Sequence, residues 1–197
     1  MIRYWHQLIF KLRIKTIHKY ISFCRSVKYK LMGMQIGENT SLSKIFVTWP
    51  HKVSLGNNCV LEHHIFFKYD GIWSGHKSIV IDDNVFIGNH CEFNINCGLR
   101  IGKFSNIASG CKFIDHDHGT NLGSLLIGQQ PSIQKEIVLE EDVWLGANVI
   151  VLKGVTIGSG AVVAAGAVVN KPIPGYEIWA GIPAKKISDR KQNSVLC

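Results

Sequence analysis

A short run of ionisable residues, Asp115-His116-Asp117-His118, is the densest such set in the regular part of this 197-residue sequence. A histidine titrates near neutral pH, so a well-placed imidazole can take a proton from an alcohol as the alcohol attacks an electrophile. An adjacent carboxylate can orient that imidazole, and Asp115 and Asp117 are also candidate substrate contacts. The run is consistent with a general base and equally with a solvated turn, so its structural setting has to decide.

The elements that position this run are repeats of six residues, which are most regular over residues 139–174. They read LEEDVW, LGANVI, VLKGVT, IGSGAV, VAAGAV and VNKPIP. The first position is always aliphatic and the fifth is small or β-branched, which predicts two inward-facing columns. The fourth position is Asp, Asn or Gly until the last repeat, and these residue types tolerate the positive φ of a corner. A short strand and a corner in every repeat predict a parallel β-helix whose triangular coils hold about eighteen residues.

The repeats divide the chain into three parts. A basic helical arm (1–35) precedes the repeat domain (36–174), and a C-terminal cap with a polar tail (175–197) follows it. Two loops, near 67–78 and at 119–136, interrupt the repeats, and loops extruded from solenoids commonly carry binding residues. The composition, 46% hydrophobic, suits one core.

The excess positive charge lies in the arm. The formal net charge is +8, yet residues 1–37 hold eight Lys or Arg and no acid, whereas residues 38–197 hold fourteen residues of each sign. We therefore expect no nucleic-acid partner for the repeat domain.

The arm also has an apolar stripe at helical spacing. Its members are Phe10, Ile14, Ile17, Ile21 and Cys24. We expect this stripe to pack on the β-helix or on a neighbouring subunit. The alternative is peripheral contact with an anionic membrane surface.

The positions of the cysteines predict free thiols rather than a disulfide framework. Four of the six occupy the fifth position of a repeat, where they replace small inward side chains: Cys59, Cys91, Cys97 and Cys111. Charged residues interrupt the arm before a secretory leader forms, and no stretch is long and apolar enough to span a bilayer. We expect a cytoplasmic protein, at the inner face of the membrane if the arm contacts lipid.

A metal site is the other chemistry that the histidines suggest. His63, His64 and His90 could join the histidines of the Asp-His run on one face of the solenoid. The spacings from His64 to His90 and from His90 to His116 are both 26 residues, which does not fit whole coils of about eighteen. We therefore predict no metal ligand and no metal requirement.

The repeats, the histidine run, DVWLGANVIVLKGVTIGSGAVVAAGAVV and WAGIPAKKI together resemble the hexapeptide-repeat acyltransferases. The sequence is most similar to the galactoside and maltose O-acetyltransferases and to the sugar O-acetyltransferases of bacterial surface polysaccharides. The resemblance implies a left-handed β-helix, a homotrimer with active sites between subunits, and acetyl-CoA as co-substrate. It is close over residues 79–190, loose over 36–78 and absent from the arm.

The resemblance also implies roles for single residues. An ungapped count from Ile101-Gly102 places the base at His118, with His116 as the second choice, and puts Asn96 at an acceptor-contacting position where relatives often have an acid. The residues that match cofactor-binding positions are Trp144, Ala147, Ala165, Asn170, Lys171 and Lys185.

The expected reaction is direct transfer of an acetyl group to a sugar hydroxyl, with a histidine as general base and no acyl-enzyme. The acceptor is expected in a surface polysaccharide or its precursor. An N-acetyltransferase of an amino sugar, nucleotide sugar or antibiotic is the enzymatic alternative. A non-catalytic scaffold and a metal-dependent hydratase are the alternatives from other classes.

Overall fold

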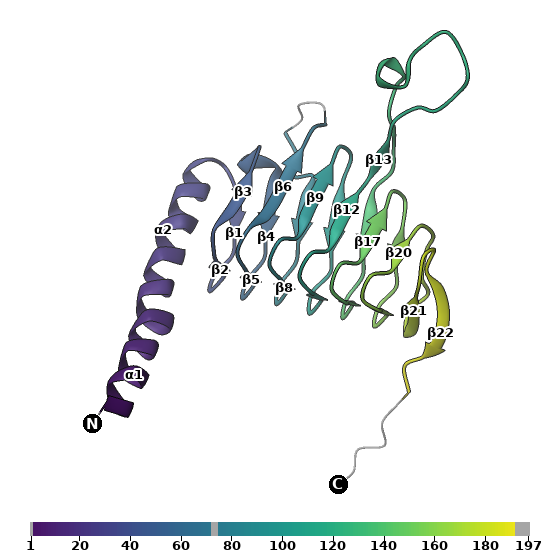
Figure 1. Cartoon of the computed structure of the whole chain (residues 1–197). Helices are drawn as coiled ribbons and strands as arrows, with labels where there is room; N and C mark the ends of the chain where they lie inside the picture. Colours follow the sequence, from purple (N-terminus) through teal and green to yellow (C-terminus); the bar gives the residue numbers. More distant parts are fainter. Residues whose placement is uncertain (1, 72–74, 192–197) are drawn as a thin grey trace.

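The computed structural model describes residues 2–71 and 75–191, without the side chains of residues 2–4 and 13–15. It is a solenoid of three parallel sheets, with a helix along its first coil and a hairpin at the other end (Figure 1). The helix consists of α1 (Ile2–Lys11), the π-helical segment η1 (Leu12–Ile17) and α2 (His18–Leu31). Two 3-10 turns, η2 (Pro50–Lys52) and η3 (Ile127–Gln129), lie in the connections.

Each coil contributes one strand to each sheet. The first sheet holds β1 (Gln35–Ile36), β4 (Val53–Leu55), β7 (Ile79–Ile81), β10 (Leu99–Ile101), β15 (Ile137–Leu139) and β18 (Thr156–Ile157). The second holds β2 (Ser41–Leu42), β5 (Val60–Leu61), β8 (Phe86–Ile87), β11 (Asn106–Ile107), β16 (Trp144–Leu145), β19 (Val162–Val163), β21 (Glu177–Ala180) and β22 (Lys185–Asp189). The third holds β3 (Ile45–Val47), β6 (Ile65–Tyr69), β9 (Glu92–Ile95), β12 (Lys112–Ile114), β17 (Ile150–Leu152) and β20 (Val168–Val169). A separate pair, β13 (His116–Asp117) with β14 (Ile133–Gln134), stands at the base of the second loop.

The predicted corners and inward columns are confirmed. The fourth positions of the regular run have positive φ, at 57° for Asp142, 59° for Asn148 and 69–72° for the three glycines that follow. The first and fifth positions of all six repeats are buried. Leu139 pairs with Ile157 and Leu145 with Val163, so one coil in this run contains eighteen residues.

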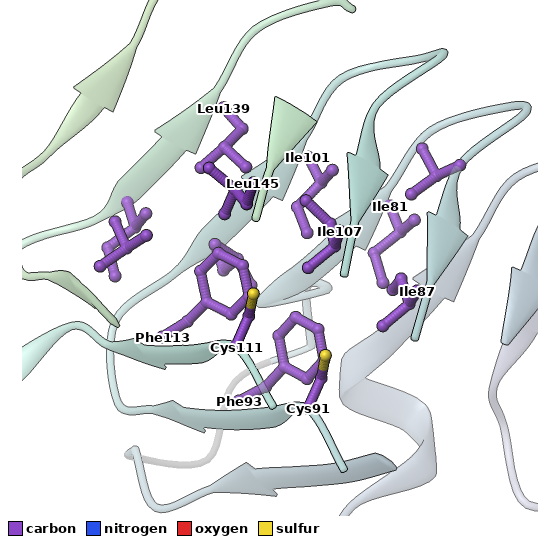
Figure 2. Packing of buried hydrophobic residues seen from close by; sticks show 14 of the residues in the cluster. Ile81, Ile87, Cys91, Phe93, Ile101, Ile107, Cys111, Phe113, Leu139 and Leu145 are labelled. Atoms are coloured by element: carbon purple, nitrogen blue, oxygen red, sulfur yellow. The ribbon is translucent and has the colours of Figure 1, made fainter. Parts of the chain in front are cut away.

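Aromatic rings fill the core beneath the third sheet (Figure 2). Phe67, Phe93 and Phe113 occupy equivalent positions in successive coils, and their ring centroids are 4.7 and 4.9 Å apart along the stack. All three side chains are completely buried. Such stacking fixes the spacing of the coils next to the Asp-His run, because a close-packed core resists local shifts.

Two predictions near the third sheet are corrected. The first loop begins at Asp70 rather than at residue 67, because Phe67 and Tyr69 alternate inward and extend β6. Cys97 is exposed, whereas the other three predicted core cysteines are buried. In its repeat the strand β9 continues inward through Ile95, so Cys97 falls in the bend that follows.

The helix contacts the solenoid differently from the prediction. The described members of the predicted apolar stripe, Phe10, Ile17, Ile21 and Cys24, are exposed, so their packing on this chain's own β-helix is contradicted. The side chain of Ile14 lies outside the described residues. Polar residues of α2 form the contacts instead. No helix among the described residues is long and apolar enough to cross a membrane.

The C-terminal segment covers the last coil. The strand β21 pairs in parallel with β19 and continues the second sheet, and β22 folds back on β21. The Glu177 carboxylate accepts a hydrogen bond from Trp179 Nε1 at 2.7 Å and forms an ion pair with Lys186. Both contacts lower the pKa of Glu177, and the contact with Lys186 has the larger effect. This hairpin occupies the place expected for the cap, and the predicted polar tail from residue 192 onward lies outside the described residues.

Candidate active site at the Asp-His run

The Asp-His run lies where the third sheet meets the first sheet of the next coil, here termed the third corner. His116 pairs with Gln134 and Asp117 with Ile133, so the second loop leaves and rejoins the solenoid beside these residues. A groove of about 550 Å³ opens there. It is lined by Asn94, Ile114, His116, Asp117, His118, Thr120, Ile133 and Lys153.

Asp115 anchors the site from beneath. Its side chain is completely buried, and its carboxylate accepts three backbone hydrogen bonds, from Asn96 at 2.8 Å, Cys97 at 2.7 Å and Gly98 at 2.8 Å. Three such donors hold an anionic oxygen pair in one orientation. Because it is buried and fully engaged, Asp115 is not positioned to contact a substrate as predicted. It is positioned to orient its neighbour.

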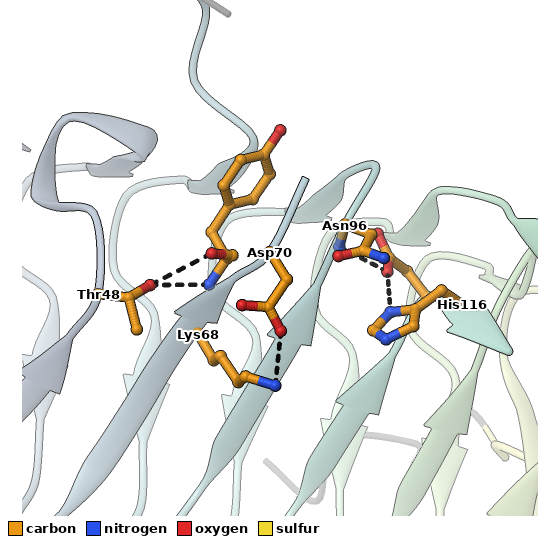
Figure 3. Close-up of polar contacts among 7 residues, drawn as sticks. Thr48, Lys68, Asp70, Asn96 and His116 are labelled. Atoms are coloured by element: carbon orange, nitrogen blue, oxygen red, sulfur yellow. Dashed lines mark hydrogen bonds and ion pairs between the residues drawn. The ribbon is translucent and has the colours of Figure 1, made fainter. Parts of the chain in front are cut away.

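That neighbour is His116. The Nδ1 atom of His116 lies 3.0 Å from Asp115 Oδ1, and its side chain is only 16% exposed (Figure 3). A carboxylate can only accept, so this contact assigns the proton to Nδ1 and leaves the lone pair on Nε2. An imidazole held in this tautomer beside an open groove is suited to accept a proton from a bound hydroxyl group.

His118 lines the same groove in a looser setting. Its side chain is exposed, and it makes no hydrogen bond within the described part of the chain. Asp117 is also exposed and forms an ion pair with Lys153. Lys153 and Asn94 were missed by the sequence reasoning. Only the strand register, which sets Ile114 opposite Asn94 and Leu152, brings them to the groove.

Asn96 and Cys97 bind Asp115 through their backbone amides, and neither is among the residues that line the groove. The Asn96 Oδ1 atom is buried without a hydrogen-bond partner among the described residues. Partial burial and the nearby carboxylates of Asp115 and Glu136 raise the pKa of the Cys97 thiol. A thiol with a raised pKa is a poor nucleophile at neutral pH, so Cys97 does not suit a covalent acyl-enzyme.

The predicted cofactor residues fall on two corners of the solenoid. Trp144 is exposed on the second sheet, and Ala147 and Ala165 follow it at the corner between the second and third sheets, here termed the second corner. The Ala147 carbonyl accepts a hydrogen bond from Gly166 at 2.8 Å, which stacks the two alanines in adjacent coils. Asn170 and Lys171 lie at the third corner, beyond His116.

Lys185 lies in the C-terminal hairpin, opposite Ala180 of β21. It begins β22, directly after Ala184, whose amide donates to the Val168 carbonyl at 2.8 Å. Lys171 stands over the Trp179 ring at 5.6 Å. Lys171 follows the last strand of the third sheet, and Lys185 lies near the start of that strand, so the two lysines flank β20 and suit an anionic ligand.

The histidines proposed for the metal alternative form a separate ladder. The rings of His64 and His90 stack with their centroids 5.1 Å apart. The rings of His63 and His18 meet edge to face, with their centroids 6.4 Å apart. Within residues 2–71 and 75–191, no group of three or more His, Cys, Asp or Glu side chains has a geometry that could hold a metal ion.

Residues 136–171, which contain the regular inward columns, match the model of the bacterial transferase hexapeptide, six repeats. The chain belongs to the hexapeptide-repeat transferase family. A protein of Mycobacterium tuberculosis named as a probable acetyltransferase is 29% identical over 97% of this chain and 58% of its own length. The galactoside O-acetyltransferase of Lactococcus lactis is 30% identical over 68% of this chain and 63% of its own length. The chain thus spans about three fifths of the length of these relatives.

A solved structure shares the fold of this family member. An N-acyltransferase from Bacillus cereus, in complex with dTDP and 3-hydroxybutyryl-CoA, superposes with a TM-score of 0.73. It is 23% identical, and the match covers 84% of this chain and 88% of that one.

Proposed function

We propose that the protein transfers an acetyl group from acetyl-CoA to a hydroxyl group of a sugar, in a surface polysaccharide or its precursor. The observation that carries this proposal is the buried Asp115 carboxylate holding Nδ1 of His116 beside an open groove. The family of the chain and the galactoside O-acetyltransferase among its relatives support the acetyl donor and a sugar acceptor.

In this proposal His116, rather than His118, is the general base. Its Nε2 takes the proton of the acceptor hydroxyl as the oxygen attacks the thioester carbon of acetyl-CoA. When the carbon–sulfur bond breaks, the proton passes from His116 to the sulfur, and free CoA and the acetyl ester leave. Asp115 acts through His116, because it fixes the imidazole and stabilises its transient positive charge.

The cofactor residues belong to the same proposal. The small side chains of Ala147 and Ala165 leave their backbone groups accessible to a pantetheine chain, with the Trp144 ring beside them. A backbone N–H near Ala147 is the candidate donor to the tetrahedral oxyanion. Lys171 and Lys185, with Asn170, would face the phosphates and the nucleotide. Asn96 and Asp117 remain proposed acceptor-side residues, Asp117 through its ion pair with Lys153.

We further propose a homotrimer of left-handed solenoids, with each site shared by two subunits. The proposed pantetheine residues and His116 lie on different corners of the chain, separated by the third sheet. The pantetheine residues are Trp144, Ala147 and Ala165. A threefold axis along the solenoid can set the second corner of one subunit against the third corner of the next. One acetyl-CoA would then contact both groups.

The test is to identify the bond that the protein makes. The protein is incubated with acetyl-CoA and matched acceptors that differ only in a hydroxyl or an amino group, and both free CoA and acetylated sugar are measured. We expect turnover with the hydroxyl sugar and a product that mild alkali deacetylates, because esters are base-labile and amides are not. An alkali-stable product would establish the N-acetyltransferase alternative, and failure to bind CoA would leave a scaffold.

A further inference from the structure

The helix α2 rests on the first coil through its polar side. His18 Nε2 lies 3.2 Å from Ser43 Oγ, the Leu42 amide donates to Ser22 Oγ at 2.8 Å, and Tyr29 Oη donates to the Ile45 carbonyl at 3.0 Å. Arg25 adds a bond to the Leu42 carbonyl at 3.3 Å. Positions 18, 22, 25 and 29 follow the spacing of one helix face, so the docking of α2 is polar.

Many exposed apolar residues of the helix lie away from these contacts, and Phe10 and Phe23 are exposed as well. In α2 and at the end of η1 the outward residues include Ile17, Tyr20, Ile21, Val27 and Leu31. In α1 and at the start of η1 they are Trp5, Leu8, Ile9 and Leu12, which are also exposed and follow an i, i+3, i+4, i+7 pattern. We call these nine residues the outer helix face. Figure 1 shows the helix at the end of the solenoid, with α1 beyond the first coil, where coils of the same chain do not cover it.

The charge of the arm indicates what covers this face. The first 37 residues carry eight basic side chains and no acidic one. None of the described lysines of the helix, Lys11, Lys19, Lys28 and Lys30, forms an ion pair within the described part of the chain. Their charge is therefore available to a partner.

We propose that the outer helix face docks on an anionic lipid surface. Its aromatic and aliphatic side chains would enter the boundary between headgroups and acyl chains, while the lysines beside them contact lipid phosphates. A second copy that meets this face with its own helix fits less well, because that contact would bring two basic, acid-free arms together. Contact with another part of a neighbouring subunit is the outcome that the oligomeric state distinguishes below. The proposal is independent of the acetyl transfer proposed above, and it places the enzyme where lipid-linked acceptors are found.

The experiment measures cosedimentation of the full-length protein with vesicles. One set contains phosphatidylcholine alone and the other an equal mixture with phosphatidylglycerol, each at low and high salt. The helix variant carries Leu8→Glu and Leu31→Glu. A matched control carries Leu122→Glu and Leu126→Glu, two exposed leucines in the second loop, so both variants lose the same side chains and gain the same charge.

We expect binding to the anionic vesicles that weakens with salt, with an affinity at least about tenfold lower for the helix variant and unchanged for the loop control. Circular dichroism and CoA titration should be the same for all three proteins, since every substituted leucine is exposed. Absence of wild-type binding to anionic vesicles would overturn the proposal. So would equal losses in both variants, or a helix variant that changes only the oligomeric state, which would identify a second copy as the partner.

Discussion

At the scale of single residues, the site depends on a carboxylate that no substrate reaches. The carboxylate oxygens of Asp115 accept hydrogen bonds from three backbone amides and contact Nδ1 of His116. Buried charge is costly unless it is hydrogen-bonded, so this arrangement is stable only because the bend after β9 presents those amides together. The result is an imidazole with one nitrogen committed and the other exposed to the groove.

The two histidines of the run provide a matched pair for mutation. We expect His116→Ala to lower the rate of acetyl transfer by about 100-fold to 10,000-fold, the range typical for loss of a general base. His118→Ala should leave the rate near that of the wild type, because no carboxylate orients that ring. The measurement is release of free CoA thiol at saturating acceptor, with CoA binding by calorimetry as the control. The reverse ranking would restore the assignment of His118.

The residue types of the candidate site were predictable from the sequence, but the contacts on which the proposed roles depend were not. The count from Ile101-Gly102 favours His118 because it uses only the distance along the chain that separates the repeat from the histidine in relatives. That distance does not indicate the direction in which either histidine side chain points. The burial of Asp115 depends on amides contributed by the preceding coil, nineteen to seventeen residues earlier in the chain. No local pattern encodes that contact.

At the scale of elements, the third sheet sets the geometry of the site. The repeat pattern explains why the corners and inward columns were predictable from the sequence. The corners and columns of residues 139–174 followed from residue types alone, since a period of six is imposed at every repeat. The sequence around Phe67 and Tyr69 predicts a loop, because Lys68 interrupts the repeat and Gly71 follows it. Stacking of Phe67 on Phe93, a contact between coils, extends the strand.

The same stack gives a prediction of stability. We expect Phe93→Ala to lower the free energy of unfolding by about 3–5 kcal/mol, because the cavity would lie between two rings that cannot close it. Phe46→Ala, on the exposed side of β3 in the same sheet, should change it by no more than about 0.5 kcal/mol. Urea unfolding at equal protein concentrations measures both. Similar effects of the two substitutions would contradict the proposed role of the stack.

At the scale of the whole molecule, the solenoid separates the groups that the proposed reaction needs. His116 lies at the third corner, whereas Ala165 lies at the second, and the third sheet stands between them. In the proposed trimer, a single chain would therefore offer the proposed base to one neighbour and the proposed pantetheine residues to the other. We propose that an adjacent subunit joins them.

Subunit mixing tests this claim most directly. His116→Ala removes the base, and Ala165→Trp fills the exposed position beside the proposed pantetheine channel, so each variant alone should be inactive. If a site takes His116 from one subunit and Ala165 from the next, randomly mixed trimers regain about a quarter of wild-type activity. We predict about a quarter for the whole coexpressed population and about a third for purified mixed trimers, because each mixed trimer has one complete site in three. A mixed oligomer that stays as inactive as its parents would show that one chain supplies both residues, and would contradict the shared site.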